Sequence, residues 1–133
     1  PIHAGGLRYH GIAPTISVMS QEKQLSTIAV NQVDAFDAAK IFTRSEGIIP
    51  APEAAHAIKA VCDEARQCAK TNTQKTILFA LTGHGFFDMT AYEEYFNGRL
   101  QPYEYPAEKV AESMKKLRAL YPWLNEVTTK YIG

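Results

Sequence analysis

The sequence has no excess charge of either sign, because 14 Lys and Arg residues balance 14 Asp and Glu residues over 133 positions. Such a chain produces no long-range field that would gather phosphate backbones or anionic head groups. It also lacks the run of roughly 18 apolar residues that a membrane span needs, and its first residues lack the features of a signal peptide. We therefore expect no nucleic-acid or membrane partner and a cytoplasmic location.

Cysteine is scarce, with only Cys62 and Cys68 in the chain. The two are six positions apart in a helical pattern, which at about 100° per residue points them to different faces, so a disulfide within that helix is geometrically poor. We expect both to be reduced packing residues. The four histidines are scattered without the spacing of a zinc site, and we expect no metal site.

Several stretches carry apolar residues at helical spacing. Asn31 suits the cap of one helix and Gly47 its end, while Pro52 suits the start of another. A loose tail is expected from Thr128. The predicted helices are Ala35–Ser45, Pro52 to near Lys70, Asp88–Tyr95 and Ala107–Tyr121.

Two runs predict β-strands. Ser26–Val30 is short and β-prone, and Thr76–Leu81 is continuously apolar, which is typical of a strand buried on both faces of a parallel sheet. Sheets usually contain about four to six strands, so two strands are too few to form one alone. We therefore predict an α/β fold that is part of a parallel sheet flanked by helices and is completed by further polypeptide.

Three polar clusters lie at the ends of predicted elements, where function is usually found. One supplies backbone amides and the Arg8 guanidinium, the next the Glu53 carboxylate, and the third the Thr82 hydroxyl among glycines. Together they suit a planar, anionic small molecule. Simpler interpretations are a surface ion pair for Arg8, a favourable helix-dipole position for Glu53 and a tight turn after Thr82. The clusters are Gly5–Gly11, Glu46–Glu53 and Leu81–Gly85.

The segments HAGGLRYHG (His3–Gly11), EGIIPAPEAAHA (Glu46–Ala57) and LTGHGFFD (Leu81–Asp88) resemble the carboxyl-terminal part of tryptophan synthase β chains, in particular the divergent second type. The resemblance extends to about residue 100. It implies a cofactor-facing segment over residues 1–100, a helical carboxyl-terminal extension and tail over 101–133, and a larger two-domain fold of the fold type II pyridoxal phosphate (PLP) enzymes.

The same resemblance implies a lyase of tryptophan biosynthesis that replaces the β substituent of L-serine with indole to give L-tryptophan. Thr82 then matches the hydroxyl that hydrogen-bonds the pyridine nitrogen of PLP. Gly83, His84 and Gly85 shape the cofactor wall. Glu53 matches a glutamate beside the cofactor ring and indole, where a carboxylate stabilises positive charge developing on indole. These assignments make Glu53 the catalytic candidate.

Arg8 is the substrate-binding candidate in this resemblance. First-type β chains carry an aspartate at the matching position, and a guanidinium suits a phosphorylated leaving group, so the donor is L-serine or O-phosphoserine. Nothing in the chain matches the family's Schiff-base lysine or its phosphate loop. We therefore expect the isolated chain to be inactive and to need the amino-terminal portion of the enzyme as its partner.

Further partners implied by the family are a second copy in a homodimer and a tryptophan synthase α chain. The alternative from another class is a non-catalytic α/β module that packs against a partner chain. Whether the chain is an isolated domain, a proteolytic product or one piece of a split enzyme stays open at this level.

Overall fold

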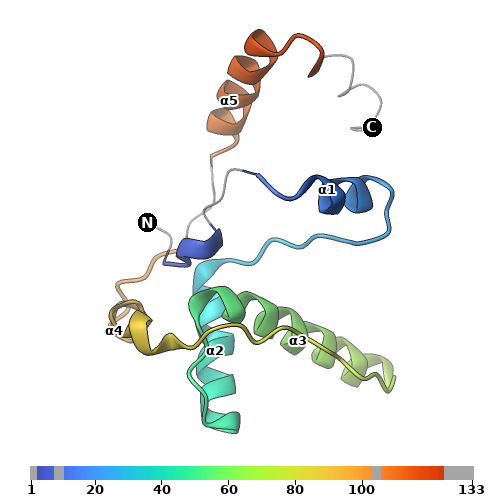
Figure 1. Cartoon of the computed structure of the whole chain (residues 1–133). Helices are drawn as coiled ribbons and strands as arrows, with labels where there is room; N and C mark the ends of the chain where they lie inside the picture. The colour runs from blue at the N-terminus through green and yellow to red at the C-terminus, as the bar shows by residue number, and fades with distance from the viewer. Residues whose placement is uncertain (1–2, 8–10, 103–105, 125–133) are drawn as a thin grey trace. The chain divides into compact units, whose positions relative to one another are not determined.

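The chain is helical in the computed structural model, which describes residues 3–7, 11–102 and 106–124 (Figure 1). Helices divide between two compact units, one formed by Pro1–Gly11 with Ile28–Tyr103 and the other by Ile12–Thr27 with Glu104–Gly133. The α-helices are α1 (Pro14–Gln21), α2 (Gln32–Glu46), α3 (Pro52–Thr71), α4 (Met89–Phe96) and α5 (Ala107–Leu120), and the short 3-10 helices are η1 (Gly5–Leu7) and η2 (Gly85–Asp88).

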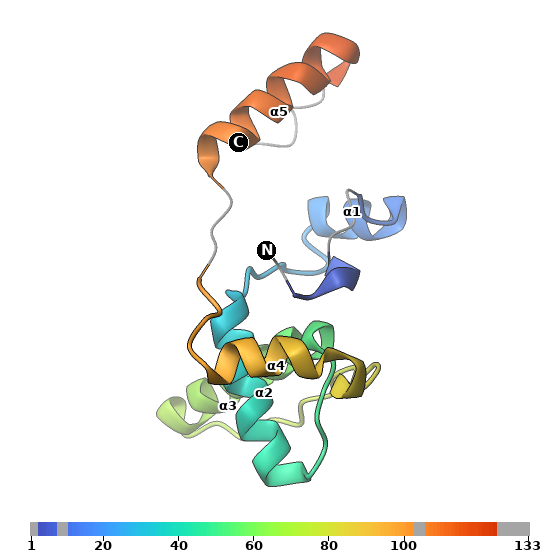
Figure 2. The ribbon, with the colours of Figure 1, turned by 90° about the vertical axis from the view of Figure 1, so that its left-hand side faces the viewer.

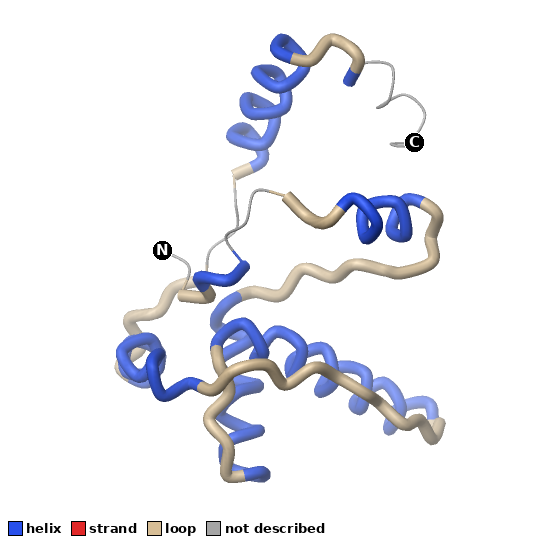
Figure 3. Tube along the Cα trace, viewed as in Figure 1, coloured by secondary structure: helices blue, strands red, loops and turns tan. Residues whose placement is uncertain are grey.

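The predicted α/β fold with a parallel sheet is wrong for this chain, because the described residues contain no β-strand (Figure 3). The described residues contain an isolated antiparallel β-bridge between Pro50 and His84. Ser26–Val30 and Thr76–Leu81 both lack regular structure, and Leu78 is 97% exposed. A strand takes its hydrogen bonds from a neighbouring strand, so an apolar run without a partner segment stays a loop.

The predicted helix capped by Asn31 is confirmed as α2, which begins at Gln32 and carries Asp34 in its first turn. The Asn31 side chain accepts a hydrogen bond from the backbone N–H of Val33 at 3.0 Å, and this cap is worth about 1 kcal/mol. Gly47 ends the helix in the left-handed conformation, with φ of 71°. Glycine adopts that conformation without the steric penalty of a Cβ atom, as the sequence indicated.

The predicted helix that starts at Pro52 is also confirmed. Pro52 occupies the first turn of α3, where its missing N–H costs nothing. Cys62 and Cys68 lie half-buried on this helix as free thiols. Long amphipathic helices of this kind bury one face against the rest of a domain.

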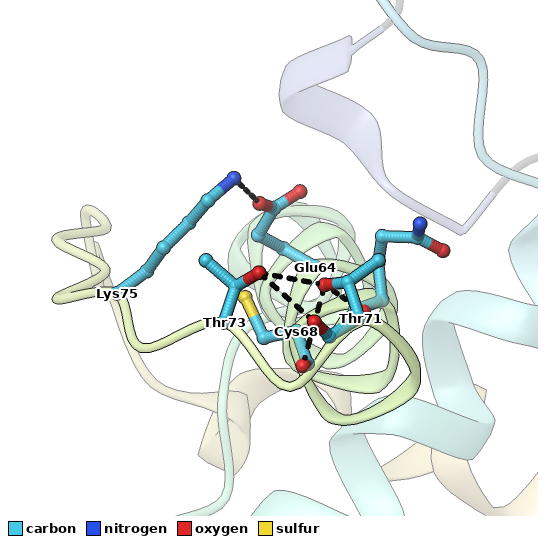
Figure 4. A network of polar contacts seen from close by, with 6 residues as sticks. Glu64, Cys68, Thr71, Thr73 and Lys75 are labelled. Atoms are coloured by element: carbon cyan, nitrogen blue, oxygen red, sulfur yellow. Dashed lines mark hydrogen bonds and ion pairs between the residues drawn. The ribbon is translucent and has the colours of Figure 1, made fainter.

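The carboxyl-terminal end of α3 turns the chain back along the helix. Asn72 adopts a positive φ of 51°, and the backbone N–H of Thr73 donates to the Cys68 carbonyl at 3.0 Å. Figure 4 shows the hydroxyls of Thr71 and Thr73 in contact and Lys75 paired with Glu64. The loop that follows therefore begins alongside α3.

The core of the first unit lies between α2, α3 and α4, which Figure 2 shows side by side. Ala35, Ala39 and Ala55 are fully buried, and such small side chains let α2 and α3 approach closely. Phe36 fills the adjoining space, with its ring 4.9 Å from the ring of Tyr92 in an edge-to-face arrangement. Aromatic pairs of this geometry add about 0.5–1.5 kcal/mol beyond their buried area.

The described residues of the second unit include the helices α1 and α5. The predicted helix Ala107–Tyr121 is confirmed as α5, which ends one residue earlier. Its apolar residues Val110, Leu117 and Tyr121 stay between 42% and 50% exposed. No helix among the described residues is both long and apolar enough to cross a membrane. The predicted tail from Thr128 falls outside the described residues, and the division at residue 100 stays a prediction.

We expect Phe36→Ala to lower the free energy of unfolding by about 3–5 kcal/mol, because it removes a buried ring from the core. Urea denaturation of the chain, followed by circular dichroism, measures this change. Phe87→Ala is the matched control, since Phe87 is 94% exposed and its truncation leaves no cavity. Equal unfolding midpoints for the two variants would contradict the described core.

Candidate functional site

The three polar clusters of the sequence meet at the segment that joins α2 to α3. On one side, the Gly6 backbone N–H donates to Oε1 of Glu53 at 2.7 Å. On the other, the Gly85 N–H donates to the Ile49 carbonyl at 2.8 Å, and His84 forms the isolated bridge with Pro50. Residues 34 to 47 positions apart in the chain are therefore brought together around one short loop.

Local sequence explains the path of this loop. Gly47 ends α2 and Pro52 starts α3, so the residues between them must run extended, and the segment from Pro50 to Pro52 is buried. Proline has no N–H to satisfy and a fixed φ, which suits a buried connection of this kind. Glu53 follows as the second residue of α3, half-buried and facing η1.

On the other side of the loop, the backbone at Gly83 and Gly85 passes close to the residues that join α2 to α3. Gly83 adopts φ of +71°, and a Cβ atom there would lie 3.4 Å from Cβ of Ala51. A Cβ atom on Gly85 would lie 2.7 Å from the Pro50 carbonyl oxygen and 2.9 Å from the Tyr92 ring. Close packing therefore requires glycine at position 85, whereas the positive φ favours glycine at position 83.

The Thr82 hydroxyl precedes these glycines and is exposed. Within the described residues it makes no hydrogen bond, so it can still donate to or accept from a ligand. The His84 ring lies beside the rings of Phe86 and Phe87, at 4.8 Å and 5.6 Å between centroids, and its Nδ1 accepts from the Phe86 N–H at 3.3 Å. The segment that follows Thr82 therefore presents an exposed group of aromatic rings, those of His84, Phe86 and Phe87.

Two carboxylates share this neighbourhood. Burial raises the pKa of Asp88 above its ordinary value, and the charge of Glu53 adds to the rise while His84 opposes it. The sequence placed Asp88 within the third motif but gave it no role. The available signal was a carboxylate in the same motif, five residues after Gly83. Only the fold shows that the charge of Glu53 acts on Asp88.

Arg8, the substrate-binding candidate, lies outside the described residues. Its position in the chain follows η1, the turn whose Gly6 contacts Glu53. The first unit also contains a groove of about 680 Å³ on another face of α3, lined by Ile28, Val61 and Leu78 among others. That groove contains none of the predicted site residues.

Three of the four lysines of the first unit, Lys40, Lys59 and Lys75, form ion pairs. The hydrogen bonds that the Lys40 ammonium donates to Tyr95 and Asp37 raise the pKa of Lys40, and the Glu64 carboxylate raises the pKa of Lys75. Lys59 pairs with Asp63. A lysine that forms a Schiff base needs its amine deprotonated, which a raised pKa disfavours. These described lysines therefore do not replace the one missing from the motifs.

Comparison with known proteins gives the family of these motifs. The chain is 51% identical over 104 residues to tryptophan synthase beta chain 2 of Pyrococcus abyssi, which covers 78% of the chain and 24% of that protein. It is 54% identical to the corresponding protein of Pyrococcus furiosus, with 78% and 23% covered, and 53% identical to that of Aquifex aeolicus, with 75% and 23% covered. No family model matches the chain.

The matched part of these relatives is their carboxyl-terminal region. The chain is therefore a segment related to pyridoxal phosphate-dependent lyases, and within them it corresponds to the carboxyl-terminal region of tryptophan synthase β chains of the second type. It spans about a quarter of the length of the curated relatives that it matches.

We expect Gly85→Ala to lower the free energy of unfolding by about 1–3 kcal/mol, because the new methyl group overlaps the backbone of Pro50 and the ring of Tyr92. Thermal denaturation of the chain measures the effect. Gly11→Ala is the matched control, since a Cβ atom there meets nothing within 4 Å. If both variants melt together, the close packing at Gly85 is disproved.

Proposed function

We propose that the chain forms the carboxyl-terminal, cofactor-facing part of a tryptophan synthase β-like lyase that replaces the β substituent of L-serine or O-phosphoserine with indole. The observation that carries this proposal is the meeting of three family motifs around one loop, with Glu53 on one side and Gly85 on the other. Each motif alone has a simpler structural explanation. Their convergence is what a shared ligand site requires.

The described residues fit the ring end of PLP. Thr82 offers an exposed hydroxyl for the pyridine nitrogen, and the loop that carries it is held in place by the close packing of Gly85 against Pro50 and Tyr92. When bound, PLP supplies the electron sink for chemistry at the substrate's α carbon. A neutral hydroxyl does not hold the pyridine nitrogen protonated, which favours elimination and replacement over transamination.

Glu53 is proposed as the catalytic carboxylate beside the ring and indole. Its carboxylate accepts the Gly6 N–H and shares the neighbourhood of Asp88, so the site carries negative charge. Negative charge stabilises a positive charge that develops on indole as its C3 attacks. Arg8 is proposed on the substrate side, where a guanidinium favours a phosphorylated leaving group.

The phosphate loop and the Schiff-base lysine are assigned to the amino-terminal portion of the enzyme, which is the partner proposed for this chain. Leu78 and Phe87 are 97% and 94% exposed, and apolar surface of this extent fits contact with further polypeptide. A homodimer of the complete enzyme and an α chain that supplies indole are further partners that the family suggests.

We expect Thr82→Ala to weaken PLP binding about twofold to tenfold and to change the absorbance spectrum of the bound cofactor. The physical reason is the loss of one neutral hydrogen bond, worth about 0.5–1.5 kcal/mol. Absorbance titration of the chain combined with the amino-terminal portion of a related β chain measures both effects. Thr76→Ala removes an equally exposed hydroxyl from the same loop and is the control.

An unchanged spectrum in Thr82→Ala would place the pyridine nitrogen elsewhere. If the combined protein binds no PLP at all, the chain is instead a non-catalytic module that packs against its partner.

We expect Arg8→Asp in the combined enzyme to shift the ratio of kcat/KM for O-phosphoserine over L-serine toward L-serine, because a carboxylate repels the phosphate. Steady-state kinetics with both donors measures that ratio. An unchanged ratio would remove Arg8 from the donor site. The chain alone serves as the blank and should show no tryptophan formation.

A further inference from the structure

The Glu53 carboxylate has one hydrogen-bond partner among the described residues, and that partner is backbone. The Gly6 N–H lies 2.7 Å from Oε1, a distance typical of a charge-assisted hydrogen bond. The two residues are 47 positions apart and belong to different elements, η1 and α3. The contact therefore depends on the tertiary structure and orients a side chain that has no other polar anchor in the described chain.

Gly6 is also the residue at which a side chain would displace this carboxylate. A Cβ atom on Gly6 would lie 3.0 Å from Cγ, 3.1 Å from Oε1 and 3.5 Å from Cδ of Glu53. The three nearest atoms within 4 Å all belong to Glu53. Any side chain at position 6 must therefore push Glu53 aside by a few tenths of an ångström, whereas glycine lets the N–H and the carboxylate meet.

We propose that Gly6 is a positioning residue for the reaction, which holds the Glu53 carboxylate through its N–H and leaves the space that the carboxylate occupies. This inference deepens the proposed function and rests on it. The charges of Glu53 and Asp88 repel each other, and the hydrogen bond from the Gly6 N–H offsets part of that repulsion at Glu53.

The contact itself is tested on the chain alone by amide hydrogen exchange of Gly6, followed by NMR. We expect the exchange rate to rise about tenfold in Glu53→Ala, which removes the acceptor while leaving the α3 backbone unchanged. Equal rates in the two proteins would show that Glu53 does not hold this amide, and the inference would fail whatever the enzyme does.

The positioning role is tested by kcat in the chain combined with the amino-terminal portion of a related β chain. We expect Gly6→Ala to lower kcat about tenfold, because misplacement by a fraction of an ångström is costly to a reacting pair. PLP affinity and the KM for the donor should change less than twofold. In a Glu53→Ala background, Gly6→Ala should change kcat less than twofold, since the atoms that it displaces are gone.

Gly11→Ala is the control for loss of a glycine, because a Cβ atom there meets nothing within 4 Å and Gly11 is not among the glycines with positive φ. We expect its kcat to equal that of the parent enzyme. A kcat loss in Gly6→Ala that persists in the Glu53→Ala background would show that Gly6 acts elsewhere. If the parent enzyme is inactive, the proposed function and the positioning role are overturned together. If the parent enzyme and the Gly6→Ala enzyme are both active with equal kcat, the positioning role alone is overturned.

Discussion

The structure of the first unit depends on the buried backbone between α2 and α3. The carbonyls of Ile49 and Pro50 are withdrawn from water and must find donors, because an unpaired buried carbonyl costs about 1–3 kcal/mol. Ile49 receives the Gly85 N–H at 2.8 Å, and Pro50 receives the Tyr92 hydroxyl at 2.6 Å. Burial raises the pKa of Tyr92, so its hydroxyl stays protonated and remains a donor. These two bonds tie the glycine loop and α4 to the same segment.

The proposed site follows from that arrangement. With the loop held, Glu53 at the start of α3 faces η1, and Thr82 to Gly85 cross the opposite side. The residues proposed to hold a cofactor ring lie in the described chain, whereas the phosphate loop and the reactive lysine are proposed to lie in another part of the protein. The large exposed side chains of Leu78 and Phe87 are consistent with a surface that further polypeptide covers.

Local signals explain why the helices were predictable. Asn31, Gly47 and Pro52 each act within one turn of their own helix, so a sequence window contains all the information that their roles need. Thr76–Leu81 shows the opposite case. Its apolar run was interpreted as a buried strand, but a strand's hydrogen bonds come from a segment distant in sequence, and no such segment pairs with it in the described chain.

The sequence by itself determined where α2 and α3 begin, where α2 ends, and which residue types stand in the three motifs, because helix caps and periodicity are properties of neighbouring residues. Only the tertiary structure decided that Gly6 meets Glu53, that Asp88 faces the same carboxylate, and that Gly85 must lack a side chain. Those facts depend on distances between residues remote in the chain. Such distances are settled by the packing of α2, α3 and α4 around one buried loop, which no local pattern encodes.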